Sequence, residues 1–126
     1  MKALNIIETA YRATLEEQDD TIVWITGAMR GAGGDLDILL RRNAVNYAVT
    51  GQDASGLVFG DWHQTQPPHI ADDLAALIEK GVGVFVVSED LEALGITRDS
   101  LVPGVKPIIR SDIAGLIRSH DQVWHW

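Results

Sequence analysis

The chain has 126 residues, 46% of them hydrophobic, which suits one globular domain spanning residues 1–126. Its net charge of −8 argues against a nucleic-acid partner, and the sequence has neither the apolar run of about 18 residues that spans a membrane nor a secretory signal, so we expect a cytoplasmic protein. There is no cysteine, and the four histidines match no ligand pattern, so we expect no disulfide, thiol chemistry, metal or cofactor.

Five short apolar runs, rich in β-branched residues, predict the strands of a sheet. They cover residues 3–9, 35–40, 82–87, 106–109 and 122–126. Helical patterns between them predict helices over residues 14–32, 44–49, 70–80, 89–94 and 112–117. Because strands alternate with helices, we expect a three-layer α/β/α domain with a mostly parallel five-stranded sheet.

The first predicted helix conflicts with local propensity. Five of the six residues in 21–26 are β-branched, which favours a strand. The helical period nevertheless extends beyond this run on both sides, through Leu15, Ile22, Ile25, Met29 and Ala32. We therefore predict a helix that begins near Thr14 and ends at the glycines of residues 31–34.

Residues 51–68 are rich in Gly, Gln, Asp and Pro and show no clear period. We predict a long loop there, yet it carries four large apolar side chains, Leu57, Val58, Phe59 and Trp62. A monomer of this size has little spare core to cover them, so we expect them to form an interface between subunits. The alternative is that the segment folds back and buries them in its own subunit.

The rest of the chain is organised around residues 81–96. The apolar run 82–87 predicts a strand buried on both faces of a parallel sheet. Ser88 follows at once and is a favourable N-cap for the next helix, while Glu89 and Asp90 suit the positive end of the helix dipole. This junction lies at the carboxyl edge of the sheet, where open α/β folds build their sites. A capping role alone also explains Ser88.

Polar residues follow each of the first three predicted strands and should meet at the same edge. They are Tyr11 and Arg12, then Arg41, Asn43 and Asn46, then Ser88 and Glu89. Arginines near helix N-termini would suit a small anionic ligand. The alternative is that the arginines are solvated and the asparagines cap turns. No GxSxG motif surrounds Ser88, so nucleophilic catalysis has little support.

Four stretches together resemble the DsrE/DsrF-like family of small α/β proteins, which includes sulfur-relay subunits. They are LNIIETAYR, DLDILLRRNAVNYAV, EKGVGVFVVSEDLEALGI and DQVWHW. The resemblance implies a DsrE-like fold, a homo-oligomer that is a trimer or hexamer, and sulfur-relay proteins as candidate partners. Sulfur-carrier members place a cysteine just after the third strand, and Ser88 occupies that position here. A serine hydroxyl cannot carry a persulfide.

Three functions are compatible with these observations. The first, which the missing cysteine favours, is a non-catalytic DsrE-like protein that acts as an oligomeric structural or regulatory partner. The second is a module that binds a small anionic ligand at the carboxyl edge of the sheet. The third is an enzyme that uses Ser88 or Glu89.

Overall fold

The computed structural model describes residues 1–11, 20–52 and 55–126. Five parallel strands form one sheet, and they are β1 (Lys2–Ile7), β2 (Asp35–Leu40), β5 (Gly83–Val87), β6 (Lys106–Ile108) and β7 (Gln122–His125). Their order across the sheet is β6-β5-β2-β1-β7. The predicted parallel sheet is confirmed, and each predicted strand end lies within two residues of the observed one.

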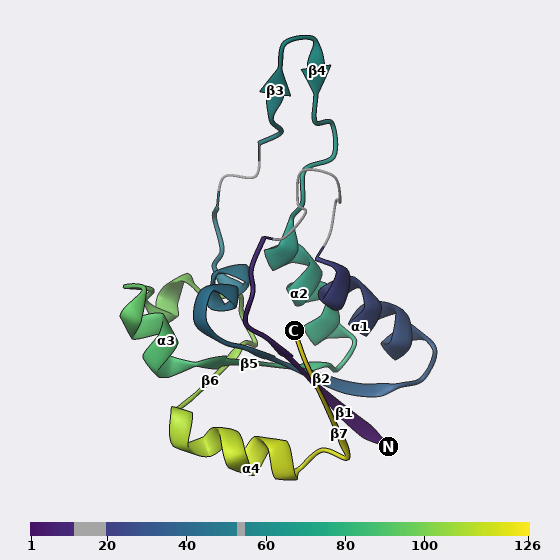
Figure 1. The fold of residues 1–126 in the computed structure, drawn as a ribbon, viewed down its shortest axis with the longest axis vertical. Helices are drawn as coiled ribbons and strands as arrows, with labels where there is room; N and C mark the ends of the chain where they lie inside the picture. Colours follow the sequence, from purple (N-terminus) through teal and green to yellow (C-terminus); the bar gives the residue numbers. More distant parts are fainter. Residues whose placement is uncertain (12–19, 53–54) are drawn as a thin grey trace.

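Helices cover both faces of the sheet (Figure 1). One face carries α1 (Thr21–Gly31), α2 (Ile70–Glu79) and the 3₁₀ helix η1 (Arg42–Ala48), and the other carries α4 (Ile113–Arg118). The short α3 (Ser88–Ala93) follows β5, and two further 3₁₀ turns are η2 (Arg98–Ser100) and η3 (Arg110–Asp112). The three-layer architecture predicted from the sequence is confirmed.

Each face of the sheet has its own core. The larger core lies under α1, α2 and η1, where Ile38, Leu40 and Val84 are fully buried. The smaller core lies under α4, where Leu4 and Leu39 are fully buried. The central strand β2 is therefore apolar on both faces, as a strand buried between two helical layers must be.

Helix α1 forms where local propensity favours a strand. Its N-cap is Asp20, whose carboxylate accepts hydrogen bonds from the N–H groups of Ile22 and Val23 at 2.9 and 3.0 Å. The helical conformation of residues 21–26 confirms the helix that the periodicity predicts. Helix formation overcomes the local strand propensity because it places the apolar side chains of α1 in the core. Helix α1 begins at Thr21, after the extended backbone of Asp20; the predicted helix start near Thr14 lies outside the described residues.

Residues 51–68 contain a hairpin that the sequence analysis missed. Strands β3 (Val58–Phe59) and β4 (Trp62–His63) pair antiparallel around a turn at residues 60–61. Gly60 in that turn has a φ of 57°, which glycine adopts without strain. The hairpin projects away from the α/β body (Figure 1). We call residues 57–63 the arm.

Candidate functional site

The parallel sheet brings the ends of its five strands to one edge, and an ionisable side chain stands at each of them. Across the sheet these residues are Arg110 after β6, Asp90 after β5, Arg41 after β2, Glu8 after β1 and His125 at the end of β7. Acidic and basic groups alternate from strand to strand. We call these five residues the edge chain.

Ion pairs connect the edge chain from one side of the sheet to the other. Asp90 lies 3.5 Å from Arg110 Nη2 and 4.0 Å from Arg41 Nε. Glu8 lies 3.3 Å from Arg41 Nη1 and 3.4 Å from His125 Nε2, which is charged only when protonated. Asp90 is buried and Arg41 is partly buried, so the central pairs are less screened by salt than exposed ones. A small anion would have to compete with two carboxylates for Arg41.

Two residues that follow strands at this edge have left-handed backbones. Tyr11 has a φ of 57° and Arg42 a φ of 49°. Residues with side chains rarely adopt this region, and such strain gathers at functional sites. The conformation of Arg42 is held by its N–H, which donates to Asp90 Oδ2 at 2.8 Å.

Ser88 lies at the junction of β5 and α3, as predicted, and its side chain is buried. Its predicted role as N-cap is wrong, because Ser88 is already the first residue of α3 and Val87 takes the cap position; no side chain among the described residues caps this helix. The Ser88 hydroxyl instead accepts a hydrogen bond from Arg98 Nη2 at 3.2 Å. A guanidinium is not a general base, so this neighbour does not activate the hydroxyl as a nucleophile.

Glu89 joins the end of β5 to the end of β6. Both of its carboxylate oxygens accept the backbone N–H of Arg110 at 2.9 Å. The N–H of Arg110 and the N–H of Glu89 itself hold the pKa of this carboxyl below its ordinary value. The side chain therefore has a structural partner at the edge, and a role in ligand binding stays a prediction.

The other predicted ligand residues come from the loop after β1 and from η1. Tyr11 Oη donates to Gln52 Oε1 at 3.0 Å, and Asn46 Nδ2 donates to the carbonyl of Asn43 at 2.9 Å. Tyr11 and Gln52 line a cavity of about 330 Å³ at the base of the arm. The described residues that line this cavity do not include Arg41, Ser88 or Glu89. Arg12 lies outside the described residues.

A buried hydrogen bond between Tyr47 and Asp20 escaped the sequence analysis. Tyr47 Oη donates to Asp20 Oδ2 at 2.7 Å and accepts the backbone N–H of Tyr11 at 2.7 Å. Burial raises the pKa of the Tyr47 phenol, and the hydrogen bond to Asp20 raises it further. The sequence pattern placed Asp20 in the early turns of a helix and not at its N-cap. An acidic residue just before a β-branched helical run was the signal that could have identified the cap.

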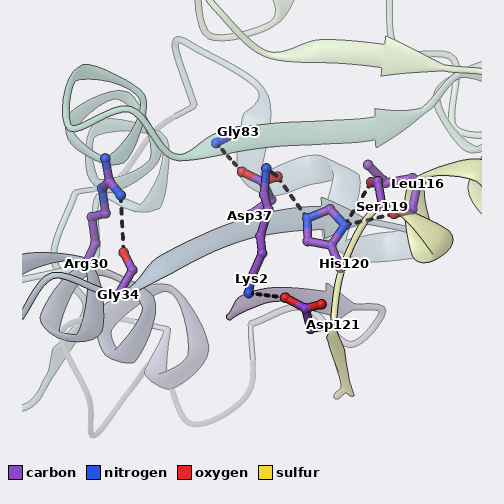
Figure 2. A network of polar contacts seen from close by, with 9 residues as sticks. All are labelled: Lys2, Arg30, Gly34, Asp37, Gly83, Leu116, Ser119, His120 and Asp121. Atoms are coloured by element: carbon purple, nitrogen blue, oxygen red, sulfur yellow. Dashed lines mark hydrogen bonds and ion pairs between the residues drawn. The ribbon is translucent and has the colours of Figure 1, made fainter.

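A second polar network lies at the opposite, amino edge of the sheet and centres on Asp37 (Figure 2). Asp37 Oδ2 lies 3.0 Å from Lys2 Nζ and 2.9 Å from His120 Nε2, and Oδ1 accepts the N–H of Gly83 at 2.8 Å. A side chain at position 83 would block this approach, because its Cβ would lie 2.7 Å from Asp37 Oδ1. Burial raises the pKa of Asp37, but the hydrogen bonds from Lys2, His120 and Gly83 outweigh it and hold the pKa below its ordinary value.

Ser119, His120 and Asp37 lie in a row with the composition of a hydrolase triad. Ser119 Oγ is 3.1 Å from His120 Nδ1, and His120 Nε2 is 2.9 Å from Asp37. His120 Nδ1 also lies 2.8 Å from the carbonyl oxygen of Leu116, which can only accept a hydrogen bond. The Ser119 hydroxyl donates to the same carbonyl oxygen at 2.7 Å, so its proton is directed at the backbone and not at the ring nitrogen. The row connects α4 to β2 and does not activate a nucleophile.

The arm exposes its apolar side chains. Leu57 is 49% exposed, Val58 59%, Phe59 60% and Trp62 47%. The rings of Phe59 and Trp62 pack against each other with centroids 5.9 Å apart. The alternative in which the segment buries these residues in its own subunit is therefore wrong.

Two global features bear on the class of protein. Within the described ranges, no group of three or more His, Asp or Glu residues is arranged to hold a metal ion. The helices of the described residues are all too short or too polar to cross a membrane.

Solved structures share this fold. The ychN protein from E. coli matches with a TM-score of 0.77 and 20% sequence identity, over 99% of this chain and 98% of that chain. A protein of unknown function, MTH1491 from Methanobacterium thermoautotrophicum, matches with a TM-score of 0.66 and 14% identity, over 99% and 98% of the two chains. This chain has a DsrE-like fold. At these identities the likeness extends to the fold alone. No family model and no curated protein matches the sequence.

Proposed function

We propose that this protein is a non-catalytic DsrE-like assembly subunit that associates with copies of itself through the arm. The observation that carries the proposal is the exposure of Phe59 and Trp62 on a hairpin that projects from the body (Figure 1). Exposed apolar clusters of this kind mark interaction surfaces. A two-stranded hairpin is also marginally stable by itself, so a neighbouring subunit would stabilise the arm that it covers.

The chemistry of the carboxyl edge favours assembly over the other two functions. Ser88 stands where the resemblance places a sulfur-carrying cysteine, and its hydroxyl cannot form a persulfide. The neighbour of that hydroxyl is Arg98, which is a cation and not a base. Arg41 already has the carboxylates of Glu8 and Asp90 beside it, which lowers its affinity for a free anion. The partner that we propose is another copy of the chain, as a trimer or hexamer, with a sulfur-relay protein as the candidate for any second component.

Light scattering at micromolar subunit concentration tests the proposal. We expect an oligomer for the unmodified protein and a lower mass for the double variant Phe59→Ala/Trp62→Ala. The matched control is Leu94→Ala/Ile109→Ala, which removes two body side chains that are 44% and 51% exposed and should leave the mass unchanged. A monomeric mass for the unmodified protein would overturn the proposal. An oligomer that persists in the arm variant would place the interface on another surface.

A further inference from the structure

A second cavity, of about 350 Å³, lies between α1 and α2. Small residues line part of it, namely Gly27 and Ala28 of α1 and Ala76 of α2, and Trp24, which is 59% exposed, stands beside them. The two helices come close together at Gly27, where an added Cβ would lie 3.3 Å from a methyl of Leu77. We call this cavity the α1–α2 groove.

We propose that the α1–α2 groove of one copy receives the aromatic side chains of the arm of a neighbouring copy. The inference rests on the proposed self-association and names the surface that receives the arm. Its first support is size, because a cavity of about 150 Å³ accepts a benzene ring, and the groove, at about 350 Å³, has room for an indole. Its second is position, because the arm points away from the body of its own subunit (Figure 1).

Charge complementarity is the third support. Lys80 forms a basic end of the groove, and Arg30 lies beside it, since its Nε donates to the Lys80 carbonyl at 2.9 Å. The groove also has an acidic residue, Asp73, in the first turn of α2. The arm carries Asp61 in its turn and His63 beyond Trp62. Seating the turn at the basic end brings Asp61 toward Lys80.

Contact between two arms is less favourable on the same grounds. It would place two Asp61 carboxylates near each other in a chain whose net charge is already −8, and like charges repel. A contact of arm with groove uses different surfaces on the two copies. Such heterologous contacts close into rings when the rotation between copies allows it, as in the proposed trimer.

The groove variant that tests this inference is Ala76→Glu. Ala76 is exposed on α2, so the substitution is compatible with folding, and a glutamate there lies four residues before Lys80, a spacing that stabilises helices. It would fill the groove and neutralise its basic end. We expect at least a tenfold loss of self-association, as in the arm variant. The matched control is Ala114→Glu, on the exposed side of α4, which should associate normally.

A mixing experiment separates this inference from the proposed function. The arm variant Phe59→Ala/Trp62→Ala keeps its groove, and Ala76→Glu keeps its arm, so the mixture retains one intact contact. When ¹⁵N-labelled arm variant is titrated with unlabelled Ala76→Glu up to about 1 mM, a range that detects weak binding, we expect the amide signals of Gly27 and Ala28 to shift. Absence of shifts, or full assembly of Ala76→Glu alone, would overturn the groove while leaving self-association in place. A monomeric unmodified protein would overturn self-association itself.

Discussion

At the scale of single residues, Asp37 shows how this small domain accommodates a buried carboxylate. An unpaired charge in the interior is costly, and Asp37 is only 6% exposed. Its partners come from three other segments, with Lys2 at the start of β1, Gly83 at the start of β5 and His120 just before β7 (Figure 2). The carboxylate therefore joins the strands at the amino edge, and its loss should affect the stability of the whole domain.

We predict that Asp37→Asn lowers the free energy of unfolding by about 2 kcal/mol, because the buried carboxylate accepts hydrogen bonds from Lys2, Gly83 and His120 that a side-chain amide cannot all replace. Urea unfolding at pH 7 measures the change. The control is Asp35→Asn at the exposed start of the same strand, which should change the free energy by less than about 0.5 kcal/mol.

The pH dependence of the stability difference between the unmodified protein and Asp37→Asn tests whether the Asp37 carboxyl is responsible for it. The pKa of Asp37 in the folded protein lies below its ordinary value of 3.8. Its contribution is therefore fully present above about pH 4 and is lost as the pH falls through the folded pKa. The stability advantage of the unmodified protein over Asp37→Asn should shrink over that interval. A constant difference down to pH 2 would assign the effect to another group.

The sequence predicted where in the fold the candidate site lies, but not which side chains contact one another there. The apolar run 82–87 ends at Ser88, so the period alone placed this residue at the carboxyl edge. Its partner Arg98 lies ten residues further along, in a 3₁₀ turn without periodicity. The cap position was missed because α3 begins at Ser88 itself, directly after β5, so that Val87 takes the cap position.

At the scale of elements, the sequence was informative wherever an element buries one or both faces. The five sheet strands and the amphipathic helix α2 follow from period and propensity alone. The strands of the arm could not be predicted in this way, because two-residue strands that are exposed on both faces show no hydrophobic period. The dipeptide Gly60–Asp61, which separates Val58 and Phe59 from Trp62 and His63, was the local signal of a hairpin.

We predict that Asp20→Ala destabilises the protein by about 3 kcal/mol. It removes the N-cap of α1, which contributes about 1 kcal/mol, and leaves the buried Tyr47 hydroxyl without its acceptor, which costs about 2 kcal/mol more. Chemical denaturation measures the loss. In the first turn of α2, Asp72→Ala removes only a favourable dipole interaction and should cost about 0.5 kcal/mol.

A double-mutant cycle with Tyr47→Phe isolates the shared hydrogen bond. We expect the coupling energy between positions 20 and 47 to be at least about 1 kcal/mol, since the two side chains are in direct contact. Effects that simply add would mean that the cap, and not the buried pair, is the source of the stability.

At the scale of the whole molecule, the edge chain makes the carboxyl side of the sheet one electrostatic unit. No local pattern predicts it, because its pairs depend on the strand order β6-β5-β2-β1-β7, which the sequence left open. Asp90 is its centre, since it faces Arg110 and Arg41 and accepts the N–H of Arg42. A substitution of Asp90 should therefore destabilise the structure on both sides of β5.

We predict that Asp90→Asn lowers the free energy of unfolding by about 1 kcal/mol, because it removes one of the two carboxylates beside Arg41 and the ion-pair partner of the exposed Arg110. Asp90→Ala should cost about 1 kcal/mol more, since an amide oxygen can still accept the N–H that holds the left-handed backbone of Arg42, whereas a methyl group cannot. Glu92→Gln, an exposed change on the same helix, should stay within about 0.5 kcal/mol. Residue-resolved hydrogen exchange should show lost protection in β6 and at the start of η1 as well as in α3. Protection lost in α3 alone, or a neutral Asp90→Asn, would mean that the edge chain is a set of independent surface pairs.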